Sequence, residues 1–255
     1  MKRILSTLVF FVLIFFNTVH SAELKKTITF PSKDGVQITA DTYIKHENLK
    51  TPLIVLFHQA MWSRGEYLEI APKLNDFGFN CLAVDLRSGV GVNGIANETA
   101  RVAEQAGKGT RYVDALPDVE AALMYARKEY GQGKVIAWGS SYSASLVLKV
   151  SGDNPDLSDG VLSFAPGEYF VALGKPATWI QDAAKKIKSP VFITSARDEK
   201  DLWSAIFAAV SSKEKVSYIP ATQGNHGSRA LWKKYQDSEG YWKAVKDFLD
   251  KNFKK

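Results

Sequence analysis

The sequence is poor in cysteine and in histidine. Cys81 is the only cysteine among 255 residues, so no disulfide can form within the chain. Four histidines stand far apart along the sequence, and this spacing offers no ligand set for zinc. A glycine-rich stretch, GVGVNG at residues 89–94, opens no predicted helix and matches a nucleotide-binding fingerprint only weakly. We therefore expect neither a metal nor an organic cofactor.

The sequence also lacks a concentration of charge of one sign. Its 33 basic and 27 acidic residues give a formal net charge of +6, without a basic stripe, which disfavours a nucleic-acid partner. Hydrophobic residues make up 45% and charged residues 24%, a globular balance that excludes a disordered chain, a coiled-coil rod and a multi-pass membrane protein. No internal repeat or interdomain linker is visible. The length suits a single α/β domain.

Long hydrophobic runs are absent except at the N-terminus. Residues 4–16 are almost entirely apolar, follow two basic residues and precede the small residues Ser21 and Ala22. This three-part pattern predicts a secretory signal peptide over residues 1–22, because the run is shorter than the roughly 20 residues that span a bilayer. The remaining domain, residues 23–255, is expected to be secreted or periplasmic, with no stable membrane insertion after cleavage.

Strand and helix patterns alternate along this domain. Residues 26–30 and 36–43 flank a turn signal and predict an antiparallel hairpin. Further strands are predicted at residues 52–58, 80–85, 134–138, 160–164, 191–194 and 216–219. Helices are predicted at residues 67–77, 115–130, 144–150 and 241–253. The alternation predicts an α/β fold with a doubly wound, mostly parallel sheet, and the long polar segment 88–114 is a candidate flap over the site.

A serine lies at a predicted strand-to-helix turn. The sequence GSSYSA, residues 139–144, follows the strand at 134–138 and opens a helix. A nucleophile on such a turn needs small residues two positions before and after it, and Gly139 and Ser143 meet this need around Ser141. The helix would aim its N-terminus at developing negative charge. The alternative is an ordinary serine-rich helix cap.

A candidate acid and a candidate base follow Ser141 along the chain, in the order Ser, Asp, His. His226, in the glycine-flanked loop GNHGS after the last strand, is the only well-placed general base. Asp198 is the preferred acid because it is the first carboxylate past the end of the strand at 191–194. Glu199 is the near alternative, and Glu168, after the preceding strand, is another. Such an acid would hold the imidazole in the correct tautomer.

Backbone amides are expected to supply an oxyanion hole. The N–H of Tyr142, directly after the serine, is one expected donor. The N–H of Ala60, with Met61 as the next choice, is the expected second donor from the loop after the strand at 52–58. His58 is expected to fix this loop by hydrogen bonds, and Trp62 and Tyr142 are candidates for the walls of an apolar acyl pocket.

Together these stretches resemble the α/β-hydrolase superfamily over residues 30–253. The resemblance rests on HQAMWSRGEY, GSSYSA, ARDEKD and GNHGS. The chain has HQ where the family usually has HG. It has Ser143 where the strand-to-helix turn around the nucleophile, called the elbow, usually ends in glycine. With only about 25 residues between Phe164 and Pro190, little or no cap domain fits, and the plan is similar to the compact dienelactone-hydrolase-like branch. Enzymes named for that lactone use a cysteine nucleophile, whereas this elbow carries serine.

The resemblance implies a secreted serine hydrolase, most simply a carboxylic-ester hydrolase acting on a small-molecule ester. Ser141 would attack the ester carbonyl, His226 would transfer the proton, and an acyl-enzyme would form and be hydrolysed. Three other functions remain open: a peptidase or amidase with the same triad, a non-catalytic binding protein on a hydrolase scaffold, and a membrane-surface lipase.

Overall fold

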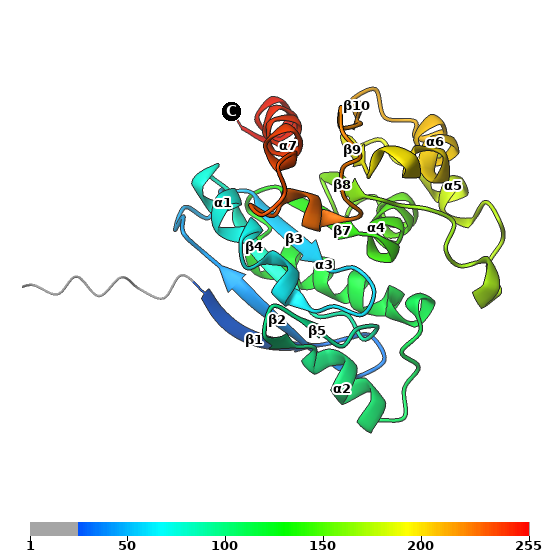
Figure 1. Ribbon diagram of the computed structural model, residues 1–255. Helices are drawn as coiled ribbons and strands as arrows, with labels where there is room; N and C mark the ends of the chain where they lie inside the picture. The colour runs from blue at the N-terminus through cyan, green and yellow to red at the C-terminus, as the bar shows by residue number, and fades with distance from the viewer. Residues whose placement is uncertain (1–24, 255) are drawn as a thin grey trace, which may run out of the picture.

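An eight-stranded sheet forms the centre of the domain (Figure 1). The structure is a computed structural model that describes residues 25–254, and the predicted signal peptide lies outside the described residues. The strands are β1 (Lys25–Pro31), β2 (Gln37–Tyr43), β3 (Leu53–Phe57), β4 (Asn80–Val84), β7 (Val135–Ser140), β8 (Gly160–Phe164), β9 (Val191–Thr194) and β10 (Lys215–Tyr218). They are ordered β1-β2-β4-β3-β7-β8-β9-β10 across the sheet.

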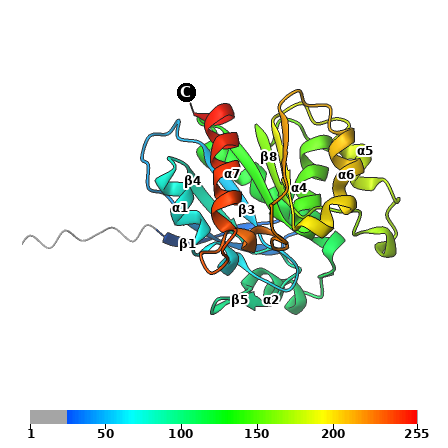
Figure 2. The same cartoon turned by 45° about the horizontal axis from the view of Figure 1, so that its top comes forward.

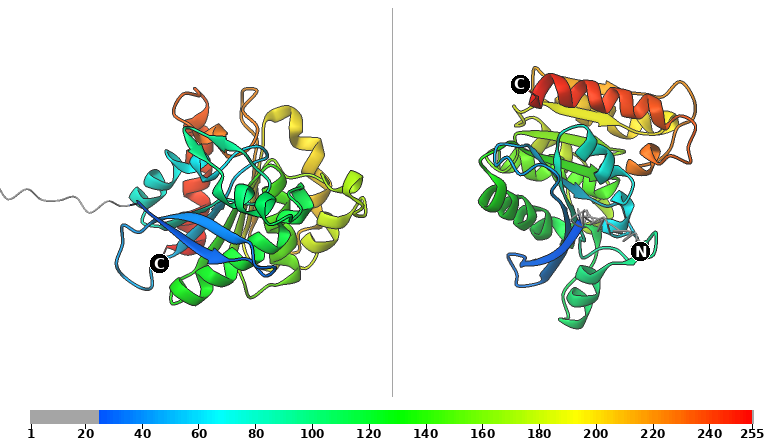
Figure 3. Two further views of the ribbon diagram at one scale, coloured as in Figure 1. Left: turned by 90° about the horizontal axis from the view of Figure 1, so that it is seen from below. Right: turned by 90° about the vertical axis from the view of Figure 1, so that its left-hand side faces the viewer.

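Most strand pairs are parallel, and the antiparallel pairs lie at the N-terminal side. β1 pairs with β2 as the predicted antiparallel hairpin, with Phe30 opposite Ile38, and β2 pairs antiparallel with β4. All pairs from β4 through β3, β7, β8 and β9 to β10 are parallel. The hairpin turn uses Gly35 at φ +86°, a conformation that costs glycine little. Figure 3 shows this hairpin, in blue, at the periphery of the molecule. The predicted doubly wound, mostly parallel sheet is confirmed.

Helices cover both faces of the sheet. They are α1 (Ile70–Asp76), α2 (Glu98–Gln105), α3 (Leu116–Tyr130), α4 (Tyr142–Asp153), α5 (Trp179–Ala184), α6 (Lys200–Ala209) and α7 (Ser238–Phe253). The buried side chains of α1 and α7 belong to one hydrophobic cluster, and those of α3, α4, α5 and α6 belong to the other. Figures 1 and 2 show α7 beside α1, and α4, α5 and α6 grouped away from them. Among residues 25–254, no helix combines the length and the apolarity needed to cross a membrane.

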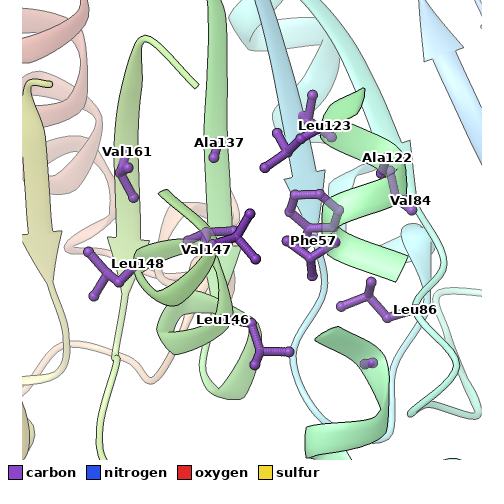
Figure 4. Close-up of a cluster of buried hydrophobic side chains, with 14 of the residues drawn as sticks. Phe57, Val84, Leu86, Ala122, Leu123, Ala137, Leu146, Val147, Leu148 and Val161 are labelled. Atoms are coloured by element: carbon purple, nitrogen blue, oxygen red, sulfur yellow. The ribbon is translucent and has the colours of Figure 1, made fainter. Parts of the chain in front are cut away.

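The sheet divides its side chains between these two clusters by simple alternation. In β3, Leu53, Val55 and Phe57 face the cluster with α3 and α4, whereas Ile54 and Leu56 face the cluster with α1 and α7. Figure 4 shows Phe57 packed among apolar side chains of α3 and α4. A strand that is covered on both faces consists of an unbroken run of apolar residues, and this run is the reason that β3 could be predicted from the sequence. Burial of both faces holds the parallel strands in register, so that their carboxyl ends lie at one edge of the sheet.

The predicted flap at residues 88–114 contains regular structure that the sequence did not reveal. It holds a short hairpin, β5 (Gly91–Val92) with β6 (Ile95–Ala96), followed by α2 and the 3₁₀ turn Tyr112–Ala115. Asn97 caps α2, because its side-chain oxygen accepts a hydrogen bond from Ala100 N at 2.8 Å. Figures 1 and 2 place α2 and β5 together at one end of the molecule.

Candidate active site

Ser141 sits on a sharp turn between β7 and α4. Its φ and ψ are 59° and −120°, a region that non-glycine residues rarely occupy. The turn is fixed by a hydrogen bond from Ser141 N to Phe164 O at 2.7 Å, and the side chain remains partly exposed. A non-glycine residue held in such a conformation at a strand end is the backbone signature of a nucleophile elbow.

The two small neighbours of Ser141 are required by close packing. A Cβ added to Gly139 would lie 2.4 Å from Ser143 O and 2.5 Å from Ala144 N, so only glycine fits there. Ser143 replaces the usual glycine without disturbing the turn, because its hydroxyl donates to Phe57 O at 2.8 Å and accepts from Ser140 N at 2.8 Å. The serine that replaces glycine at position 143 therefore anchors the elbow to β3.

The imidazole of His226 is paired with a carboxylate. His226 Nδ1 lies 2.5 Å from Glu199 Oε1, and the two side chains are 28% and 20% exposed. Glu199 ends the 3₁₀ turn Arg197–Glu199 after β9, here called the acid turn, and its other oxygen accepts from Ala196 N at 3.2 Å. The Arg197 guanidinium donates to Pro220 O at 2.6 Å and so ties this turn to the loop that leads to His226.

The acid beside His226 differs from the one preferred on sequence grounds. Asp198 is exposed and has no hydrogen bond to His226 among the described residues, because the acid turn points its side chain outward. The carboxylate of Glu168 accepts hydrogen bonds from Ile180 N and Gln181 N at the start of α5, which occupies it at a helix terminus. Of the three predicted acids, the structure brings only Glu199 to the imidazole.

A buried polar cluster joins the histidine loop (residues 223–228) to the elbow. Ser228 N donates to Ser140 Oγ at 2.8 Å, and Ser140 Oγ donates to Glu66 Oε1 at 2.7 Å. The other oxygen of Glu66 accepts from Gln59 N at 2.8 Å. The Glu66 carboxyl thus holds the elbow and the oxyanion loop directly, and the histidine loop through Ser140. Sequence reasoning did not identify Glu66 as part of the site.

Burial changes the proton affinity of Glu66. Its side chain is fully inaccessible, and desolvation raises the pKa of the carboxyl to about 8, against the lowering effect of its hydrogen bonds to Gln59 and Ser140. The carboxyl is therefore mostly protonated at neutral pH. Its hydrogen-bond partners are a backbone N–H and a hydroxyl, and within residues 25–254 it forms no salt bridge; the charge of Arg229 lowers the pKa without outweighing the burial.

The oxyanion loop (residues 58–63) is held from both sides. His58 is fully buried, and burial lowers its pKa to about 4, so the ring is neutral. Its Nε2 accepts from Leu86 N at 2.9 Å, which leaves the proton on Nδ1 to donate to Gln59 O at 2.8 Å. This bond fixes the plane of the peptide between Gln59 and Ala60. His58 has the loop-fixing role that the sequence suggested.

The two amides expected to face an oxyanion are both available. Among the described residues, neither Ala60 N nor Tyr142 N donates a hydrogen bond to the backbone or to a side chain. Met61, the next residue, has φ +65°, a left-handed conformation in which the usual residue is glycine. The structure thus leaves two donors unused on the two segments that the sequence singled out.

The hydroxyl of Ser141 and the imidazole of His226 share no hydrogen bond in the described chain. The elbow and the histidine loop are instead joined by the hydrogen bond from Ser228 N to Ser140 Oγ. Hydrogen bonds between catalytic groups are often long in free enzymes and shorten when substrate binds. Residues 25–254 contain no group of three His, Cys, Asp or Glu side chains arranged to hold a metal ion. The arrangement is suited to nucleophilic acyl transfer.

Comparisons with known proteins place the chain within a family. The profile of the family described as serine aminopeptidase, S33 matches residues 50–216, a stretch that includes Ser141 and Glu199 and ends before His226. A search of curated proteins finds no match.

Solved structures share the fold at low identity. The esterase Pf2001 of Pyrococcus furiosus is 18% identical, with a TM-score of 0.66 over 89% of this chain and 92% of its own. A dienelactone hydrolase from Anabaena variabilis is 12% identical, with a TM-score of 0.67 over 90% and 98%. Est1E from Butyrivibrio proteoclasticus, solved with ferulic acid, is 15% identical, with a TM-score of 0.67 over 88% and 98%. At these identities the likeness concerns the fold alone. Because the family profile covers more than half of the sequence, the chain belongs to the serine aminopeptidase S33 family of α/β hydrolases.

Proposed function

We propose that the chain is a serine hydrolase that cleaves carboxylic esters through Ser141, His226 and Glu199. The observation that carries this proposal is the pairing of His226 Nδ1 with Glu199 Oε1 at 2.5 Å. A carboxylate at Nδ1 keeps the proton on that nitrogen and leaves Nε2 as the acceptor that a serine nucleophile needs. The elbow backbone of Ser141 supplies the second support.

The reaction proceeds in two acyl transfers. Ser141 Oγ attacks the ester carbonyl carbon while His226 Nε2 takes the hydroxyl proton, and the amides of Tyr142 and Ala60 stabilise the oxyanion. The bond from carbon to the alcohol oxygen breaks, and His226 returns the proton to the departing alcohol. Water then attacks the acyl-enzyme, giving its proton to His226. The bond between the acyl carbon and Ser141 Oγ breaks as His226 returns this proton to Ser141 Oγ, and the carboxylic acid leaves. Glu199 stabilises the imidazolium in both halves.

The test is covalent labelling together with turnover. Wild type should react with a fluorophosphonate and hydrolyse p-nitrophenyl acetate, and Ser141→Ala should lose both. Ser204→Ala is the matched control, because Ser204 is a partly exposed serine on α6 whose hydroxyl donates to Lys200 O of its own helix. Equal turnover by wild type and Ser141→Ala would refute the assigned nucleophile. If wild type shows neither labelling nor turnover, the result would favour a non-catalytic binding protein.

A peptidase is the second candidate, because the family description names an aminopeptidase. Peptide hydrolysis would use the same three residues and differ in the leaving group. Aminoacyl p-nitroanilides, assayed beside the esters, separate the two activities. Export completes the proposal: with residues 1–22 as a signal peptide, the enzyme would act in the periplasm or outside the cell. N-terminal sequencing of the exported protein checks this.

A further inference from the structure

A cavity of about 360 Å³ lies beside the oxyanion loop. Its apolar lining comes from three separate parts of the chain: Met61, Val90 with Tyr112 from the segment after β4, and Leu173. The volume is near the small end of the roughly 300–1,000 Å³ typical of ligand pockets. We propose that this cavity binds the acyl group of the ester substrate, and that the group is uncharged and either a medium-length alkyl chain or a single aromatic ring. The inference rests on the proposed esterase function.

Exposed apolar side chains are concentrated at this cavity. The described chain exposes eight large apolar side chains, and three of them, Met61, Val90 and Tyr112, line the cavity. Exposed apolar groups gathered at one hollow mark a binding surface, whereas singly scattered ones do not. Met61 is 61% exposed although it occupies a left-handed backbone conformation, so its side chain gains little from core packing to offset that cost.

Contacts join the cavity to both oxyanion donors. Met61 directly follows Ala60, and Met61 O accepts hydrogen bonds from Val90 N and Gly91 N at 3.1 and 3.2 Å. Tyr112 stacks on Tyr142, with ring centroids 4.9 Å apart, and Tyr142 directly follows Ser141. Tyr142 itself is buried behind Tyr112, and Trp62 stacks on Trp232, so neither of the two aromatic residues expected to form the pocket lines this cavity.

The position of the cavity selects the acyl group over the alcohol. The departing alcohol must lie beside His226, which gives it a proton. No residue lining the cavity comes from the acid turn or from the histidine loop. The cavity instead adjoins the oxyanion loop, on which the carbonyl oxygen of the substrate rests. A group that enters the cavity is therefore the one attached to the carbonyl carbon.

The charges around the cavity select an uncharged group. Both arginines that line it are already paired: Arg87 donates to the carboxylates of Asp34 and Asp118, and Arg111 donates to Asp114 at 3.0 Å. The nearby Glu104 would repel an anion. An acyl group that carries a second carboxylate would find no unpaired cation among the lining residues and would lose its hydration.

The test fills the cavity and compares acyl chains. Val90→Trp adds bulk at a side chain that is 63% exposed, and Val216→Trp on the edge strand β10, at a valine that is 39% exposed, is the matched control. We expect Val90→Trp to lower the ratio of kcat/KM for p-nitrophenyl hexanoate over p-nitrophenyl acetate by about tenfold or more. Val216→Trp should leave the ratio as in wild type. Leu173→Trp provides a second filled variant, and circular dichroism verifies folding.

Each of the other possible results contradicts a different part of the proposal. An unchanged ratio in folded Val90→Trp and Leu173→Trp, with acetate still hydrolysed, overturns the acyl pocket and leaves the proposed esterase intact. A loss confined to hexyl acetate relative to ethyl acetate assigns the cavity to the alcohol. Faster hydrolysis of the p-nitrophenyl hemisuccinate than of the hexanoate refutes the uncharged class. Absence of both labelling and ester turnover in wild type removes the proposed function, and this inference with it.

Discussion

Replacement of Glu66 by glutamine should remove a large pH dependence of stability. Glu66 is fully buried, and its pKa is raised to about 8 by desolvation. In the unfolded chain the carboxyl is solvated and titrates near its ordinary value of 4.5. Below 4.5 both states hold the proton. Between 4.5 and 8 only the folded state holds it, so rising pH progressively favours unfolding. Glutamine keeps the shape of the neutral acid and cannot ionise.

The magnitude follows from the width of that window. The interval from 4.5 to about 8, at 1.36 kcal/mol per pH unit, amounts to at most about 5 kcal/mol of folding free energy. The contribution is fully present below pH 4.5 and is lost as the pH rises through 8. Asp85, whose pKa burial raises to about 6, titrates in the same window, but it does so in both proteins and cancels in their difference.

The assay is urea unfolding followed by tryptophan fluorescence at pH 5, 7 and 9. The free energy of unfolding of Glu66→Gln minus that of wild type should become more positive by several kcal/mol from pH 5 to pH 9. Glu47→Gln, at an exposed glutamate, is the matched control and should show no such trend. A constant difference between Glu66→Gln and wild type over this range would refute the claim that burial keeps Glu66 protonated.

Three other tests by substitution address separate parts of the site. Glu199→Gln should lower kcat/KM for p-nitrophenyl acetate by roughly a thousandfold or more, whereas Asp198→Asn should leave it nearly unchanged; equal losses would contradict the assignment of the acid. Gly139→Ala should destabilise the fold by about 3 kcal/mol or more in urea unfolding, because the new Cβ meets backbone atoms at 2.4 Å; a wild-type midpoint would show that the elbow can relax. Met61→Gly should be about 1 kcal/mol more stable to urea than Met61→Ala, since only glycine tolerates φ +65° freely, and the opposite order would argue against strain there.

The fold was predictable because its core elements have strong local patterns. β3 and β7 are apolar on both faces, and such runs indicate buried parallel strands without any knowledge of the neighbours. The short helices α2 and α5 were not predicted, because six to eight residues carry too few turns to display a helical period. They are stabilised by capping groups instead, Asn97 for α2 and Glu168 for α5.

The elbow could be located from sequence for a local reason, and the acid could not. Small residues are needed on either side of Ser141 because the end of β7 and the start of α4 lie in close contact. Both lie within the six residues 139–144, so the pattern is visible in the local sequence. The choice between Asp198 and Glu199 depends on how the acid turn is rotated, which is set by the bond from Arg197 to Pro220 and by that from Ala196 N to Glu199. The first of these contacts joins residues 23 positions apart, and it therefore leaves no mark on the local pattern.

Glu66 shows what kind of group sequence reasoning overlooks. Its hydroxyl partner, Ser140, lies 74 positions away, so nothing near Glu66 in the sequence announces the contact. The same carboxyl also holds Gln59 N, and Ser140 holds Ser228 N in turn. Displacing the oxyanion loop, the elbow or the histidine loop would therefore leave a buried polar group without a partner, at a cost of about 1–3 kcal/mol for each group. In a domain that has no disulfide to restrain it, this shared buried cluster is what makes independent movement of the three segments unfavourable.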